Sequence, residues 1–115
     1  MRRSLTKSEI VRSSAEIDRL FRTGRRYNGS GLKLIAAPNG LDYSRLIVIP
    51  VRHFGNSVQR NLARRQYKEL FRTNKDRIRS GFDLAFIVYK GQTASYGEKE
   101  LILISLLSQA GLWTA

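Results

Sequence analysis

The sequence contains no cysteine and a single histidine, His53, among its 115 residues. Without cysteine, the chain cannot form a disulfide, a thiolate nucleophile or a cysteine-based zinc site. One histidine excludes a histidine-rich metal centre and leaves little for a histidine-based catalytic triad. The sequence also lacks a glycine-rich phosphate loop, a pair of carboxylates at a recognisable spacing and a nucleophile–base motif. These absences argue against an enzyme that works on its own.

Long hydrophobic runs are missing as well. The N-terminus begins Met1-Arg2-Arg3-Ser4 and lacks the apolar run of a signal peptide. No stretch approaches the ~18 apolar residues of a membrane span. We therefore expect a soluble, cytoplasmic protein.

Acidic residues are scarce, because nine Asp and Glu face 21 Lys and Arg, for a formal net charge of +12. Fifteen of the bases are arginine, whose planar guanidinium suits phosphate oxygens and the faces of nucleobases. Since 42% of the residues are hydrophobic, the chain can still bury a core. We expect one domain over residues 1–115 with a flexible start at residues 1–12. Nucleic acid is the first candidate partner, although charge alone does not separate it from an anionic membrane.

The first predicted helix starts at Ser13, which is followed three residues later by Glu16, as in a capping box. Gly24 is expected to end it. One apolar face is predicted at helical spacing by Ile17, Leu20 and Phe21.

Four segments have the composition of strands. They are residues 32–37, 44–51 and 82–89, with a weaker signal at 26–28. The turn Pro38-Asn39-Gly40 joins the first two of these runs. Residues 46–49 are apolar on both sides, which predicts a central strand, and Pro50 marks its end.

Two more helices complete the expected order. Gly55-Asn56-Ser57 opens a helix that runs to about residue 72 or further, and Ser95 with Glu98 forms a capping box before a helix over 101–110. The resulting fold class is α+β, a single-domain α-β-β-β-α-β-α sandwich with helices against a sheet.

The most informative segment is residues 52–72, which hold six bases and one acid, Glu69. Four bases step along one side of the predicted helix at i+4 spacing, and neighbours widen that side to an arc of roughly 140°. On the other side of the helix, four residues are expected to pack on the sheet: Leu62, Ala63, Tyr67 and Leu70. A merely solvated helix face would more often intersperse acids, so the unrelieved charge favours a polyanion. This basic arc consists of Arg60, Asn61, Arg64, Arg65, Lys68 and Arg72.

With this basic segment and the turn before it, the sequence resembles the protein subunit of bacterial ribonuclease P. The resemblance rests on a Gly-Asn turn, an Arg-Asn pair, a following basic pair and a final basic residue with glutamate. Segments 20–26 and 81–84 also match the end of that family's first helix and its last strand. The motif itself spans residues 54–69, Phe-Gly-Asn-Ser-Val-Gln-Arg-Asn-Leu-Ala-Arg-Arg-Gln-Tyr-Lys-Glu.

The resemblance implies a protein that joins a large catalytic RNA, in a holoenzyme that removes the 5′ leader of precursor tRNA. The chain would be part of an endoribonuclease only in this holoenzyme, because in the family the RNA carries the chemistry and binds most of the Mg²⁺. No catalytic residue, metal ligand, small-molecule substrate or membrane partner is then expected for the protein. The implied fold is similar to the second domain of ribosomal protein S5, with a left-handed βαβ crossover, against the usual right-handed rule.

In that family the basic helix and the turn before it face the RNA subunit. A cleft between the sheet and the helices holds the single-stranded leader. Matching positions assign the leader cleft to Ile17, Phe21 and Ile35, and Phe21 could stack on a base for ~1–3 kcal/mol. They assign binding of the RNA subunit to Arg52, His53, Asn56, Arg60, Asn61, Arg64, Arg65, Lys68 and Arg72.

The sequence departs from the family pattern in two respects. Leu62 stands where the Arg-Asn-Arg triplet has its third member, and Ile17 and Ile35 stand where the cleft is often aromatic. Leader contacts would then depend on apolar packing and backbone electrostatics. A generic ribosomal or other RNA-binding protein would have the same charge and size, while the strands and turns disfavour a membrane-surface peptide.

Overall fold

Four strands form one mixed sheet in a computed structural model that describes residues 7–90 and 95–114. The strand order is β1-β2-β4-β3, with antiparallel pairs β1–β2 and β2–β4 and a parallel pair β3–β4. The strands are β1 (Arg25–Gly29), β2 (Leu32–Pro38), β3 (Arg45–Pro50) and β4 (Phe82–Val88).

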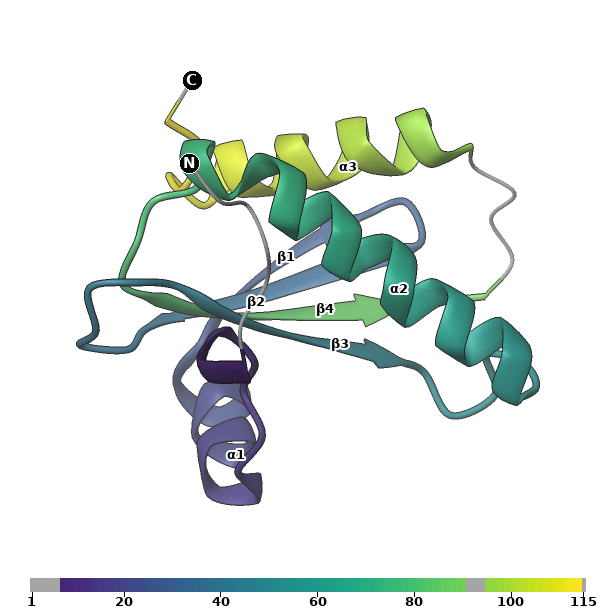
Figure 1. The fold of residues 1–115 in the computed structure, drawn as a ribbon, viewed down its shortest axis with the longest axis horizontal. Coiled ribbons are helices and arrows are strands. Elements are labelled where there is room, and N and C mark those ends of the chain that lie inside the picture. Colours follow the sequence, from purple (N-terminus) through teal and green to yellow (C-terminus); the bar gives the residue numbers. More distant parts are fainter. Residues whose placement is uncertain (1–6, 91–94, 115) are drawn as a thin grey trace.

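The helices lie on both faces of this sheet (Figure 1). One face is covered by α2 and α3, whereas α1 packs against the opposite face. The predicted α+β sandwich in the order α-β-β-β-α-β-α is therefore confirmed. The helices are α1 (Ser14–Thr23), α2 (Ser57–Asn74) and α3 (Tyr96–Gln109), with short 3₁₀ turns η1 (Lys7–Glu9) and η2 (Lys75–Arg77).

The main core lies between the sheet and α2 and α3. Strand residues at alternate positions point into it, and the ring of Tyr67 meets that of Phe86 edge-on at 6.2 Å between centroids. A smaller core lies under α1 and contains Leu20, Ile35 and Ile87. The sheet is therefore apolar on both faces, but far more of its surface is covered on the α2 and α3 side.

The helix α2 connects two neighbouring parallel strands, β3 and β4. In Figure 1 both strands point the same way, β3 lies nearer the viewer than β4, and α2 crosses above them. With the helix toward the viewer and the strands pointing up, the chain moves to the left from β3 to β4. The crossover is left-handed, as the family resemblance implies and against the general preference.

The prediction that residues 46–49 form a central strand is wrong. The strand β3 lies at an edge of the sheet, because β4 inserts between it and β2. Its side chains alternate between buried and half-buried, with Leu46 and Val48 in the main core and Ile47 and Ile49 on the other face. Both sides of this strand are apolar because each face of the sheet has a core, although α1 covers its face only in part. A central position in the sheet is not the reason.

Residues 7–12 pack along the outer edge of β3. Ile10 forms a bridge to Leu46, and the Val11 amide donates to the Leu46 carbonyl at 2.9 Å. Val11 is fully buried. The remaining part of the segment expected to be flexible, residues 1–6, lies outside the described residues.

Helix capping follows the sequence closely, with one exception. Ser95 and Glu98 form the predicted reciprocal capping box of α3. Ser13 Oγ accepts from the Glu16 amide at 3.4 Å, but the Glu16 carboxylate does not return to Ser13. That carboxylate binds Arg45 instead, so the predicted second half of this capping box is wrong.

Candidate nucleic-acid interface

The turn before α2 is fixed by a capping box that the Gly-Asn motif makes possible. Asn56 Oδ1 accepts from the Gln59 amide at 2.9 Å, and Gln59 Oε1 accepts from the Asn56 amide at 3.0 Å. A β-carbon at position 55 would collide with the Gln59 carboxamide, so Gly55 leaves the space that this cap occupies. The motif therefore sets where α2 begins and how its side chains are directed.

The basic side of α2 is the surface formed by six side chains of this helix. Asn61 and Arg65 are exposed, and the other members are half-buried. Among the described residues, no acidic side chain forms an ion pair with Arg64, Arg65 or Lys68. The six side chains are Arg60, Asn61, Arg64, Arg65, Lys68 and Arg72.

The preceding loop extends this surface. Arg52, His53 and Asn56, which the resemblance assigned to the same interface, are exposed. Unpaired cations along one helix and its leading turn form a surface suited to a chain of phosphates.

Arg60 differs from the other bases of this surface. Its guanidinium donates to the Val51 carbonyl at 2.7 Å and to the Pro50 carbonyl at 3.1 Å. These carbonyls lie where the chain leaves β3. Arg60 therefore ties the first turns of α2 to the sheet, in addition to carrying charge.

The one acid on α2 is neutralised by its own helix. Arg72 pairs with Glu69 three residues earlier, through both guanidinium nitrogens Nε and Nη2. This hydrogen bond lowers the pKa of Glu69 and raises that of Arg72. Glu69 thus stays ionised at neutral pH and cancels Arg72, whereas Arg64, Arg65 and Lys68 keep their charge uncompensated.

Leu62 does not pack on the sheet as predicted. It is 49% exposed and lies on the side of α2 that is turned toward α3. The buried side of α2 is formed instead by Ala63, Tyr67, Leu70 and Phe71. At about 100° per residue, Leu62 sits too far around the helix to reach the sheet that Ala63 contacts.

The leader-cleft residues of the resemblance lie on the opposite face of the sheet, around α1. Phe21 is half-buried and packs with Ile35 in the smaller core, but Ile17 lies outside this cluster. Ile35 is only 1% exposed. The structure therefore brings Phe21 and Ile35 together, with Ile35 beneath the surface and Phe21 at it.

Sequence reasoning missed the strip of sheet that α1 leaves uncovered. Ile47, Ile49 and Val51 are half-buried there and pack against the smaller core beside Phe21. Lys33 lies on the same face, two residues before Ile35 in β2. The signal was present in the alternation of residues 45–51, but interpreting these residues as a central strand concealed it.

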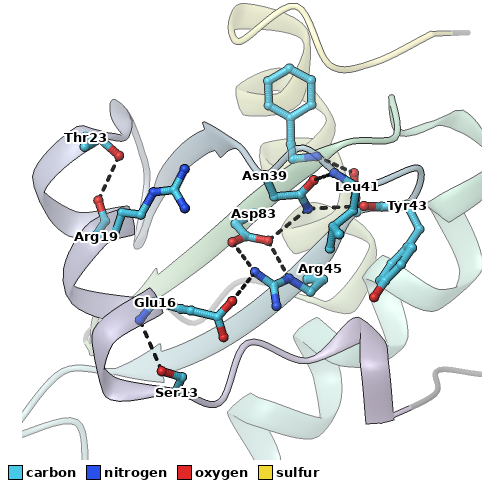
Figure 2. Close-up of polar contacts among 11 residues, drawn as sticks. Ser13, Glu16, Arg19, Thr23, Asn39, Leu41, Tyr43, Arg45 and Asp83 are labelled. Carbon is cyan, nitrogen blue, oxygen red and sulfur yellow. Dashed lines mark hydrogen bonds and ion pairs between the residues drawn. The ribbon is translucent and has the colours of Figure 1, made fainter.

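A buried ionic cluster joins α1 to the sheet close to this strip (Figure 2). Arg45 in β3 donates to both carboxylate oxygens of Asp83 in β4, from Nε at 2.8 Å and from Nη2 at 2.7 Å. The same Nη2 reaches the Glu16 carboxylate of α1 at 2.8 Å. Asn39, in the turn after β2, donates to Asp83 Oδ1 at 3.0 Å.

The cluster is well satisfied and shielded. The Arg45 and Asp83 side chains are 14% and 12% exposed, and the hydrogen bond to Asp83 is the main reason why the pKa of Arg45 is raised. The Glu16–Arg45 bridge therefore attaches α1 to the sheet in addition to the apolar contacts of Leu20 and Phe21.

Known proteins are similar to this chain in sequence and in fold. The family model named Ribonuclease P matches residues 5–111. A protein named ribonuclease P protein component from Petrotoga mobilis is 39% identical over 73% of this chain and 71% of its own length. One of the same name from Clostridium novyi is 33% identical over 95% of this chain and 99% of its own. The chain belongs to the ribonuclease P protein family.

Solved structures of ribonuclease P proteins have the same fold. The protein from Thermotoga maritima is 29% identical and superposes with a TM-score of 0.81, over 88% of this chain and 96% of that one. A Staphylococcus aureus ribonuclease P protein reaches 0.83 at 21% identity, over 93% and 99% of the two chains, and supports the fold alone.

This ribonuclease P protein has few residues of the types that bind metal ions, with one His, nine Asp and Glu and no Cys. Across residues 7–90 and 95–114, no three His, Asp or Glu side chains gather as metal ligands. In the same residues, no helix has the length and apolar content to cross a membrane.

Breaking the Arg45 cluster should destabilise the fold. Arg45→Met leaves Asp83 buried without its cation, so we expect the free energy of unfolding to fall by about 3 kcal/mol. Glu16→Gln is the matched control. Its carboxylate belongs to a side chain that is 41% exposed, so the expected loss is about 1 kcal/mol or less. Urea denaturation measures both, and equal losses would contradict the central role of Arg45.

Proposed function

We propose that this chain is the protein subunit of ribonuclease P, which binds the catalytic RNA and the 5′ leader of precursor tRNA. The observation that carries this proposal is the basic side of α2, which a family-typical Gly-Asn turn positions and whose charge is largely unpaired. The holoenzyme would cleave precursor tRNA at the 5′ end of the mature sequence, in the cytoplasm where bacterial tRNA is made.

Binding of the RNA subunit is assigned to the basic side of α2 and to the exposed loop residues Arg52, His53 and Asn56. Phosphate contacts by Arg and Lys provide affinity through release of counterions and do not require a particular base sequence. Arg64 Nη1 donates to Asn61 Oδ1 at 3.0 Å, which holds the Arg64 side chain along the helix surface. This arrangement suits an RNA helix or loop that runs along α2.

Leader binding is assigned to the opposite face. There, Ile47, Ile49 and Val51 form an apolar strip beside Phe21, with Lys33 on the same face. A single strand can place bases on such a strip while its phosphates approach the cation. Phe21 is the aromatic side chain here, so it is the candidate for stacking, while Ile17 and Ile35 would support it.

The chemical step is assigned to the RNA subunit with its bound Mg²⁺. The contribution of the protein is to hold the RNA subunit and the leader at the same time, on two different faces of one sheet. Such positioning raises the effective concentration of the correct complex.

Reconstitution tests this function directly. The purified protein is added to a bacterial ribonuclease P RNA at low Mg²⁺, and release of the leader from precursor tRNA is followed. We expect a clear gain over the RNA alone, because protein cations replace part of the metal screening. A general RNA-binding protein would bind without this gain, and either that result or cleavage without added RNA would refute the proposal.

Substitutions on the basic side of α2 should change the salt dependence of RNA binding. If each side chain contacts one phosphate, Arg64→Ala or Lys68→Ala weakens binding and reduces the slope of log K against log salt by about 1. Arg77→Ala is a matched control, because Arg77 is exposed in η2, outside α2. An unchanged slope for the two α2 variants would place these side chains away from the RNA.

Truncation of Phe21 should affect the leader selectively. We expect Phe21→Ala to weaken holoenzyme binding of a precursor tRNA with a long leader by about tenfold, since base–aromatic stacking contributes ~1–3 kcal/mol. Binding of a precursor with one leader nucleotide should not change. Phe82→Ala provides the control, because Phe82 is a half-buried aromatic on the other face. Equal losses for both substrates would remove Phe21 from the leader cleft.

A further inference from the structure

A cavity of about 420 Å³ opens between α2, α3 and the end of β4. Its walls are largely apolar, with Phe54, Leu62 and Tyr67 among them, and Lys90 and Lys99 complete the lining. Ligand sites are typically cavities of about 300–1,000 Å³ with apolar walls and a few polar groups. The cavity is on the face covered by α2 and α3, opposite the strip assigned to the leader.

The hydroxyl of Tyr67 is the first observation that points to a ligand. Tyr67 is 3% exposed, and its hydroxyl forms no hydrogen bond with any described residue. Every fully enclosed polar side-chain atom of the described residues has a partner, so this oxygen must reach open space, which here is the cavity. Burial raises the pKa of Tyr67, which keeps the hydroxyl protonated and able to donate.

A second polar group lies beside it. Lys99 donates to Gln66 Oε1 at 2.7 Å, which bridges α3 to α2 at the cavity. The bridge uses the carbonyl oxygen of Gln66 and leaves its NH₂ group without a protein partner among the described residues. A hydroxyl and an amide between apolar walls are the groups that read the edge of a nucleobase.

The charge of the lining selects an anionic ligand. Among the described residues of the lining, Lys90 and Lys99 carry charge and no acidic side chain contributes. Leu62 stands where the family resemblance places a basic residue, and it is 49% exposed at this cavity. The entrance therefore combines an apolar contact with nearby cations, as a base and its phosphate require.

We propose that this cavity holds one unstacked nucleotide of the catalytic RNA, with its base against Leu62, Phe54 and the Tyr67 hydroxyl and its phosphate near Lys90 or Lys99. This inference rests on the proposed function. The RNA subunit is the source because α2 provides one wall of the cavity and also carries the basic side assigned to that RNA. The leader is excluded as the source because its strip lies across the sheet.

Chemical probing of the RNA tests the proposal. The RNA subunit is treated, with and without protein, with reagents that modify the Watson–Crick edges of all four bases. With the unaltered protein, we expect at least tenfold protection of one unpaired nucleotide. Tyr67→Phe and Leu62→Asp should abolish that protection while the backbone protection due to the basic side of α2 remains. Tyr43→Phe, a tyrosine outside the cavity, should leave both unchanged.

The outcomes separate this inference from the function on which it rests. If the RNA subunit is bound but Tyr67→Phe and Leu62→Asp leave every base protection unchanged, the nucleotide site is wrong and the proposed function stands. Protection that appears only on precursor tRNA also overturns the assignment. If the unaltered protein does not bind the RNA subunit at all, the proposed function fails first. Tyr67→Phe removes a single oxygen, and an unchanged melting temperature confirms that the variant folds.

Discussion

Parallel pairing of β3 with β4 is the constraint on which the remaining structure depends. Two neighbouring parallel strands cannot be joined by a tight turn, so the chain must return across one face of the sheet. The helix α2 is that return, and its sequence has to serve two purposes at once. Ala63, Tyr67 and Leu70 fill the core, while the remaining circumference is free to carry charge. Arg60 contributes to both the packing and the charged surface, because its guanidinium donates to the carbonyls of Pro50 and Val51 at the end of β3.

As a result of this arrangement, the helices cover one face of the sheet more fully than the other. One is covered by two helices and holds the larger core, whereas α1 alone partly covers the other. Besides the apolar contacts of Leu20 and Phe21, α1 is attached through an ionic hydrogen bond from Arg45 to Glu16, and the position of Arg45 is set by Asp83. A network of this kind is directional, so it fixes the angle of the helix as well as its contact. The uncovered strip beside α1 is a consequence of the same inequality.

Local features of the fold could be predicted from the sequence, because they depend on neighbours in the chain. The caps at Asn56 and Ser95 are examples, and so is the buried side of α2 at Tyr67 and Leu70. Features set by distant residues could not. The edge position of β3 depends on where β4 inserts, and the direction of the Glu16 carboxylate depends on Arg45, 29 residues away in the chain. The handedness of the crossover cannot be predicted from hydrophobic periodicity, and its prediction depended on the family resemblance.

The candidate interface shows the same division. Arg64, Arg65 and Lys68 were identified by spacing alone, but spacing could not show that Arg60 also binds backbone carbonyls or that Arg72 is cancelled by Glu69. Leu62 is predicted to pack on the sheet because it lies outside the basic arc, although its angle on the helix directs it toward α3. Periodicity identifies the side of a helix, and only tertiary packing decides what lies against it.

The bridge between Ile10 and Leu46 has a consequence for association between copies of this chain. A sheet edge with free amides and carbonyls recruits further strands and promotes aggregation. Here the segment before α1 occupies part of the outer edge of β3. The opposite edge, β1, begins with the exposed bases Arg25 and Arg26. One edge is thus blocked by the chain itself and the other repels a second positively charged copy, which keeps the sheet of a strongly basic protein from growing by strand addition.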